Sequence, residues 1–273
     1  MAGTTSQDSP APGNVKDAII AFRDVHKSFG KLVVLRGVNF TLQAGKTTVI
    51  IGESGTGKSV LLKHMVRLLK PDRGEVHFKG RRIDDLSERD LVETRTRFGF
   101  LFQLGALFDS MTVAENIAFP VVEHRHGKPA EAQRVVKEKL RMVGLEGIEN
   151  KKPAELSGGQ RKRVALARAI ALDPEVILYD EPTTGLDPIR SDVINELIRK
   201  LQRELKVTSV VVTHDMASVR KVGDRVMMLH EGNFIFDGTP GELESSEDER
   251  VRRFVEGKAT KSDLDGLMMK GKP

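Results

Sequence analysis

A glycine-rich stretch, GESGTGKS at residues 52–59, has the residue types and the spacing that bind a phosphate chain. It fits the pattern G-x-x-x-x-G-K-[ST] at every fixed position. Glycines let successive backbone N–H groups point at phosphate oxygens, the lysine reaches the β- and γ-phosphates, and the serine hydroxyl binds Mg²⁺. The residues expected at the phosphates are Gly52, Glu53, Ser54, Gly55, Thr56, Gly57, Lys58, Ser59 and Val60.

The segments on either side of this stretch favour a phosphate loop over a flexible Gly/Ser linker. TTVIIG, residues 47–52, is a continuous apolar run that predicts a buried strand. Apolar residues from 60 to 69 predict an amphipathic helix, whose positive N-terminal end would face the same anion. A linker would not lie between two such elements.

A pair of carboxylates, Asp180 and Glu181, follows a second apolar strand in VILYDEP. Such a pair after a strand is usually a solvated turn, but ligands of open α/β sheets bind at strand ends. Together with the upstream phosphate loop, the pair predicts that Asp180 holds Mg²⁺ through water and that Glu181 polarises the attacking water.

A third stretch, LSGGQRKRVALARAIALDPE from Leu156, predicts a second anion site at a helix N-terminus, this time without a lysine. A plain capped helix would explain Ser157 and the apolar face that follows. It would not explain Gly158 and Gly159, because glycine is a poor residue in the first turn of a helix.

These motifs resemble, in number and order, those of the ATP-binding cassette (ABC) ATPases over residues 19–257. The resemblance implies an α/β P-loop NTPase fold with a mostly parallel core sheet, an antiparallel β subdomain and a helical subdomain. Its motifs are the phosphate loop at 52–59, the glutamine loop at Gln103, LSGGQ at 156–160, YDEP at 179–182, the D-loop GLD at 185–187 and the switch histidine His214.

The resemblance also implies how the site works: ATP and Mg²⁺ are bound in a head-to-tail homodimer, between the phosphate loop of one subunit and the signature of the other. It assigns catalysis to Glu181 and His214, and Mg²⁺ ligation to Ser59, Gln103 and Asp180. It assigns contacts in trans to Ser157, Gly158, Gly159, Gln160 and Asp187.

The chain departs from the family's pattern at two positions. The family often has a tyrosine stacking on adenine, and this chain offers Phe29, whose aromatic face can also stack. Val60 stands where threonine is common, so a minor hydroxyl contact is lost while the backbone N–H can still meet a phosphate.

The expected organisation is one ABC ATPase domain at 17–257, with a helical subdomain at about 104–165, between a disordered tail at 1–16 and a flexible or partner-docked tail at 258–273. Further strands are predicted at 38–45, 75–80, 97–103 and 208–215, and a hairpin turning at 231–233. Ser87, the capping box of Thr112 with Glu115, and Pro129 with Gly144 predict helix ends.

The bulk composition indicates a soluble protein: of 273 residues 39% are hydrophobic and 30% charged, and the net charge is +5. The basic residues are interspersed and the longest cluster is Arg161–Arg163, which favours a solvated mixed surface and argues against nucleic acid as a partner. The absence of cysteine excludes disulfides and thiolate metal sites and fits the cytosol.

The expected location is cytoplasmic, with any membrane work done through a partner. No apolar run approaches the roughly 18 residues that span a bilayer. The first 16 residues lack the apolar region of a secretory signal.

The segment FLFQLGALFDSMTVAENIAFPVVEH, residues 100–124, resembles the ATPases of Mla/Mce lipid-transport systems. That resemblance implies a transmembrane permease and a substrate-binding MCE-domain protein as partners, and Leu107 and Phe108 are expected to contact the permease. The alternative is the ATPase of a small polar-solute importer, for example of amino acids. A P-loop switch protein would lack LSGGQ and the D-loop.

Overall fold

The computed structural model describes residues 18–125 and 129–259, so the tail predicted at 1–16, and all but the first two residues of the tail predicted at 258–273, lie outside the described residues. Its centre is a six-stranded sheet in which all neighbours pair in parallel except the hairpin at one edge. This confirms the mostly parallel core sheet. In order across the sheet the strands are β10 (Asn233–Gly238), β9 (Arg225–His230), β3 (Thr47–Ile51), β8 (Thr208–Val212), β7 (Val176–Asp180) and β6 (Phe98–Leu101).

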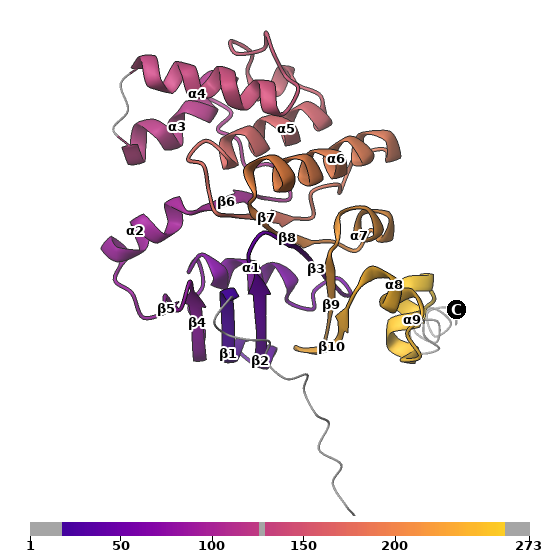
Figure 1. Cartoon of the computed structure of the whole chain (residues 1–273). Coiled ribbons are helices and arrows are strands. Elements are labelled where there is room, and N and C mark those ends of the chain that lie inside the picture. The colour runs from indigo at the N-terminus through magenta and orange to yellow at the C-terminus, as the bar shows by residue number, and fades with distance from the viewer. Residues whose placement is uncertain (1–17, 126–128, 260–273) are drawn as a thin grey trace, which may run out of the picture.

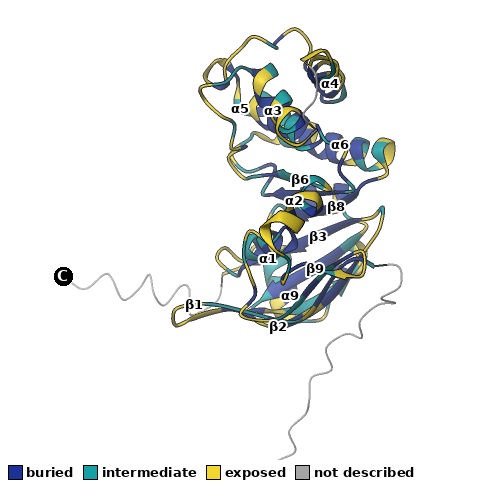
Figure 2. Ribbon diagram, turned by 90° about the vertical axis from the view of Figure 1, so that its left-hand side faces the viewer, coloured by how far each residue is buried: buried dark blue, intermediate teal, exposed yellow. Residues whose placement is uncertain are grey.

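The central strands of this sheet are buried on both faces. Every residue of β3, β7 and β8 is buried, and Figure 2 shows β3 and β8 in dark blue. Val49 and Ile51 pack into the core on the helical side, whereas Ile50 packs toward α1 (Lys58–Met65) and the second sheet. Continuous apolar runs therefore form these strands because each face has its own core.

The second sheet is antiparallel, in the order β2 (Leu32–Gln43), β1 (Ala18–Phe29), β4 (Arg73–Phe78) and β5 (Arg81–Arg82), and it lies beside β10 in Figure 1. It confirms the antiparallel part of the fold. Strand β2 is longer than the predicted 38–45. Strand β1, whose pairing with β2 is broken by several bulges, was not predicted from the sequence.

The helical part covers the face of the central sheet that lies away from the antiparallel sheet (Figure 1). Thr112 and Glu115 form the predicted capping box, with Glu115 Oε2 accepting the Thr112 N–H at 2.7 Å. Gly144, two residues after α4 ends, has φ of 65°. The helices here are α3 (Val113–Arg125), α4 (Pro129–Met142), a 3-10 turn at Pro153–Glu155, α5 (Gly158–Ala169) and α6 (Pro188–Leu205).

Four shorter helices complete the part of the chain that the structure describes. Ser87 caps α2 as predicted, since its hydroxyl accepts the Asp90 N–H at 3.3 Å. Among the described residues, no helix combines the length and the apolar character needed to cross a membrane. These helices are α2 (Glu88–Thr96), α7 (Met216–Val222), α8 (Pro240–Glu244) and α9 (Glu249–Glu256).

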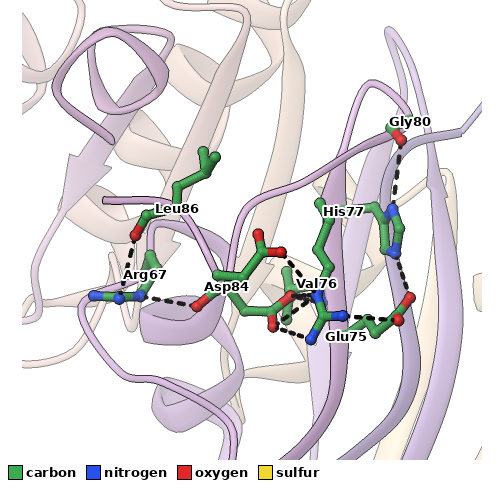
Figure 3. Close-up of polar contacts among 9 residues, drawn as sticks. Arg67, Glu75, Val76, His77, Gly80, Asp84 and Leu86 are labelled. Atoms are coloured by element: carbon green, nitrogen blue, oxygen red, sulfur yellow. Dashed lines mark hydrogen bonds and ion pairs between the residues drawn. The ribbon is translucent and has the colours of Figure 1, made fainter. Parts of the chain in front are cut away.

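A polar network fastens the end of α1 to the antiparallel sheet (Figure 3). The Asp84 side chain, 3% exposed, accepts the Val76 N–H at 2.8 Å and pairs with the Arg82 guanidinium at 2.8 Å. Arg67, just beyond α1, donates to the Asp84 backbone carbonyl at 3.3 Å. Burial alone would raise the pKa of Asp84, but the Arg82 and Val76 hydrogen bonds hold it below its usual value.

Replacing Asp84 with alanine should lower the free energy of unfolding by about 1–3 kcal/mol, because the buried Val76 N–H would lose its acceptor. Chemical denaturation measures this. The matched control is Asp85→Ala, since Asp85 is exposed and its Oδ2 lies 3.7 Å from Nε of the same Arg82. Equal losses from both variants would show that the network does not fasten the sheet.

Candidate functional site

The parallel pairing of β3, β8 and β7 brings three predicted segments to one edge of the sheet. Ile50 and Asp180 are both in register with Val212, so the three strands end at the same level. The phosphate loop follows β3, Asp180 ends β7, and His214 follows β8. Carboxyl ends of parallel strands are where open α/β sheets bind ligands.

The phosphate loop has a backbone that only glycine fits at its first position. Gly52 has φ of 150°, and a Cβ there would lie 2.3 Å from the Leu229 carbonyl oxygen. Gly57, with φ of 102°, is the residue from which α1 begins. The loop is therefore held in shape by close approach to β9 and by the start of a helix.

The Lys58 ammonium lies across the loop. It donates to the backbone carbonyls of Gly52 at 2.8 Å and of Glu53 at 2.7 Å. Burial lowers the pKa of Lys58, and the carboxylates of Glu181 and Asp180 oppose that effect. The ammonium is thus inside the loop that the sequence predicts to bind phosphates.

Ser59 and Asp180 are joined directly, since the serine hydroxyl donates to Asp180 Oδ1 at 2.7 Å. Burial raises the pKa of Asp180, while the Ser59 hydrogen bond acts against the rise. A hydroxyl and a carboxylate are ligand types that fit Mg²⁺. Among the described residues, no group of three or more His, Cys, Asp or Glu side chains lies where it could hold a metal ion.

Glu181 is held on both carboxylate oxygens. His214 Nδ1 lies 3.0 Å from Oε1, and the Thr184 hydroxyl donates to Oε2 at 3.1 Å. The Glu181 backbone has φ of 49°, in the left-handed region that is uncommon for residues other than glycine. The Glu181 side chain is 12% exposed and that of His214 is 58% exposed, so the pair lies at the mouth of the site.

The signature and the D-loop form a second cluster. Ser157 caps α5, accepting the Gln160 N–H at 3.3 Å, and Asp187 caps α6, accepting the Arg190 N–H at 3.0 Å. A Cβ on Gly159 would lie 3.5 Å from the Arg190 side chain, so the two helix starts are neighbours. Within residues 18–125 and 129–259, no hydrogen bond joins either cap to the phosphate loop.

Two predicted site residues, Gln103 and Phe29, lie at the edges of this arrangement. The exposed Gln103 meets the site through its backbone carbonyl, which accepts a hydrogen bond from Lys162. Phe29 ends β1 with its ring 47% exposed, and the Lys27 ammonium lies 5.4 Å from the ring centroid. Val60 is half-buried on α1.

Two residues that contact Glu181, Thr184 and Lys162, were not predicted from the sequence. The interpretation of Arg161–Arg163 as solvated surface is wrong for Lys162, which is 6% exposed. Its ammonium donates to the carbonyls of Gln103 and, at 3.2 Å, Glu181. Burial lowers the pKa of Lys162, against the attraction of both carboxylates. Helical spacing could have found it, because Lys162 shares a face with the buried Ala165 and Leu166.

An apolar groove of about 340 Å³ lies beside the glutamine loop. Phe108, 42% exposed, lines it with Phe119 at a centroid distance of 5.0 Å. Leu107 instead packs against the core, so its predicted surface role is wrong. Of these two consecutive residues, Phe108 faces the groove and Leu107 packs against the core of the helical part.

A phosphate loop joined to a strand-end carboxylate pair defines a P-loop nucleotide-binding protein, and the LSGGQ stretch at the start of α5 narrows the class to ATP-binding cassette ATPases. The ABC transporter family model matches residues 35–184, more than half of the chain. The chain belongs to the ABC transporter family, as its motifs indicated.

Individual relatives share much of its sequence. It is 44% identical over 232 residues to the probable ribonucleotide transport ATP-binding protein mkl of Mycobacterium tuberculosis, covering 85% of this chain and 65% of that protein. The chain therefore spans about two thirds of that relative. It is 44% identical over 230 residues to the intermembrane phospholipid transport system ATP-binding protein MlaF of Haemophilus influenzae. That match covers 84% of this chain and 87% of that protein.

A solved structure confirms the fold class. It is the dimeric post-hydrolysis state of the ATP-binding cassette MJ0796 bound to ADP and Pi, which superposes with a TM-score of 0.75 at 35% identity. The match covers 81% of this chain and 98% of that one.

Proposed function

We propose that this protein is the ATP-hydrolysing subunit of a phospholipid or hydrophobic-substrate transporter, acting as a head-to-tail homodimer. Its partners are a transmembrane permease of the Mla type and an MCE-domain protein, and it lies on the cytoplasmic face of the membrane through the permease. The observation that carries the proposal is that one chain bears two separate half-sites: the phosphate loop with Glu181, and the capped helix starts at Ser157 and Asp187.

In this proposal the chain's own residues bind ATP and prepare the attacking water. The N–H groups of residues 53–60 and the Lys58 ammonium hold the phosphates, and Phe29 stacks on the adenine. Ser59, Asp180 and Gln103 would hold Mg²⁺. When bound, that ion neutralises charge on the phosphate oxygens.

Glu181 has the surroundings that a water-polarising group needs. Its carboxylate is held by Thr184 and His214, so its direction is fixed before the substrate arrives. His214 is exposed enough to meet both the γ-phosphate and the water. A carboxylate in this position accepts a proton as the water attacks.

Replacing Glu181 with glutamine should reduce kcat by about 10²- to 10⁴-fold, since the amide cannot take up the proton. ATP binding should persist, and ATP should trap a stable dimer measurable by size-exclusion chromatography. Glu175→Gln is the matched control, because Glu175 immediately precedes the same strand at its far end and pairs with Lys79 and Arg97. Near-normal hydrolysis by the Glu181 variant removes Glu181 from this role.

The signature half-site completes the partner's site in the proposed dimer. Ser157 is exposed at the N-terminus of α5, where N–H groups and the helix dipole favour an anion. Gly158 and Gly159 keep side chains away from that helix end. An interface that repeats by two-fold symmetry then creates two equal composite sites.

Replacing Ser157 with arginine should abolish hydrolysis with little effect on the melting temperature, because the residue lies exposed at a helix start. Lys58→Ala should also be inactive. Equal mixtures should recover about one quarter of the wild-type sites, since each mixed dimer has one composite site with two intact halves.

Steady-state ATPase activity of the mixture measures this recovery. The control mixes Ser157→Arg with the double variant Ser157→Arg/Lys58→Ala, which has no intact combination. No recovery, with subunit exchange shown by labelled chains, would contradict the head-to-tail arrangement.

The identity to MlaF and the resemblance of residues 100–124 to Mla/Mce ATPases support a lipid cargo. The similarity to a probable ribonucleotide transport protein gives a second candidate cargo class, and a small polar-solute importer is a third. Purification of the native complex followed by lipid analysis tests the choice. Enriched phospholipid supports the proposal, whereas ATPase activity stimulated by a ribonucleotide or an amino acid contradicts it.

The groove beside the glutamine loop is the proposed seat of a permease coupling helix. Its aromatic lining is partly exposed, and the Arg168 guanidinium lies 5.6 Å from the Phe108 ring centroid. An exposed apolar patch of this kind marks an interface.

Replacing Phe108 and Phe119 together with serine should weaken retention of the subunit by the immobilised permease and leave its own ATPase activity unchanged. The expected physical cause is loss of the apolar lining that the coupling helix would bury. Leu68→Ser is the control, because Leu68 is 51% exposed and lies outside the groove lining. A large drop in melting temperature for the double variant would place both rings in the core.

A further inference from the structure

The buried ammonium of Lys162 connects three motifs of the proposed site. Lys162 lies on α5, which begins at the signature. Its Nζ donates to the backbone carbonyl of Gln103 in the glutamine loop and, at 3.2 Å, to that of Glu181. One side chain therefore joins the signature helix, to which it belongs, to the glutamine loop and to the backbone of Glu181, the expected catalytic residue.

Burying this ammonium requires compensation from its surroundings. A charged group taken out of water is costly unless hydrogen bonds satisfy it, and charge-assisted bonds are stronger than neutral ones. Lys162 donates these hydrogen bonds to two backbone carbonyls and makes no ion pair within 4.0 Å among the described residues. The contact therefore fixes backbone position, and it leaves the Glu181 carboxylate free for His214 and Thr184.

The Glu181 backbone needs such support. Its φ of 49° lies in the left-handed region, which strains a residue that has a Cβ, so surrounding contacts must hold it. Its N–H donates to Val212 on β8 at 2.9 Å, and its carbonyl accepts from Lys162. The peptide groups on either side of the strained residue are thus tied to the sheet and to α5, and together they aim the carboxylate.

We propose that Lys162 is a positioning residue for hydrolysis, which holds the Glu181 backbone in its left-handed conformation and ties it to Gln103 and the signature helix. A shift of α5 or of the glutamine loop then changes the direction of the Glu181 carboxylate. This inference rests on the proposed role of Glu181 as the water-polarising group.

A neighbouring residue offers a matched comparison. Arg163, next to Lys162 on α5, also donates to two backbone carbonyls, those of Val143 at 3.4 Å and Gly144 at 3.1 Å. Those carbonyls follow α4, away from Glu181. Loss of Arg163 therefore reports the general effect of removing a basic residue from this helix.

The experiment measures kcat, KM for ATP and melting temperature for the full-length homodimer carrying Lys162→Met, Lys162→Arg or Arg163→Met. Lys162→Met should lower kcat about 10- to 100-fold with KM changed by less than about threefold, because positioning acts in the transition state. Lys162→Arg should recover most of kcat, and Arg163→Met should retain it. A normal kcat in Lys162→Met, or an equal loss in Arg163→Met, overturns the proposal.

Two further variants separate this inference from the assignment of Glu181. Lys162→Met in the Glu181→Gln background should cause no additional loss, since residues that act as a unit are not additive; a full additional loss overturns the proposal. Near-normal hydrolysis by Glu181→Gln alone would instead overturn the assignment of Glu181. If Lys162→Met does not fold, Lys162→Gln, which keeps a donor but is shorter, should show a smaller loss of kcat at unchanged KM, and an unchanged kcat overturns the proposal.

Discussion

The parallel pairing of β3, β8 and β7 is the constraint on which the rest of the structure depends. These strands are buried on both faces, so a shift in register would expose apolar side chains on one face or the other. Because they end at one level, the phosphate loop, the carboxylate pair and the histidine must meet there. The hydrogen bond from Ser59 to Asp180 closes that edge.

Charge compensation is the second feature of the site. Two ammonium groups, Lys58 and Lys162, and two carboxylates, Asp180 and Glu181, lie in a partly desolvated region. Burial lowers the pKa of each lysine and raises that of Asp180, while the opposite charges offset these shifts. Each lysine donates to backbone carbonyls and not to a carboxylate. The arrangement keeps charged groups available for a substrate that brings its own negative charge.

The antiparallel sheet and the helical part are connected to that edge of the central sheet by different contacts. The antiparallel sheet is fastened by Asp84 and Arg67 to the end of α1, the helix that begins at the phosphate loop. The helical part reaches the edge through α5, whose contacts are hydrogen bonds to the carbonyls of Gln103, Gly105 and Ala106 and to that of Glu181. These contacts are the physical links through which the signature and the catalytic edge share a position.

The sequence by itself determined the family, the order of strands and helices around each motif, and the helix caps at Ser87 and Thr112. These features depend on neighbouring residues: glycine spacing, capping side chains and apolar runs act within a few positions. Strand β1 was missed because bulges and mixed polarity hide its period, and it is stabilised by β2 and β4.

Only the tertiary structure decided which side chains of a local pattern turn inward. In sequence, Lys162 cannot be told apart from the basic residues on either side of it. In the structure it is buried, and two carbonyls from distant segments accept hydrogen bonds from its ammonium. Leu107 and Phe108 are equally apolar, but the chain turns one into the core and the other into the groove. Such choices depend on contacts between segments far apart in the chain, whose positions the local pattern does not specify.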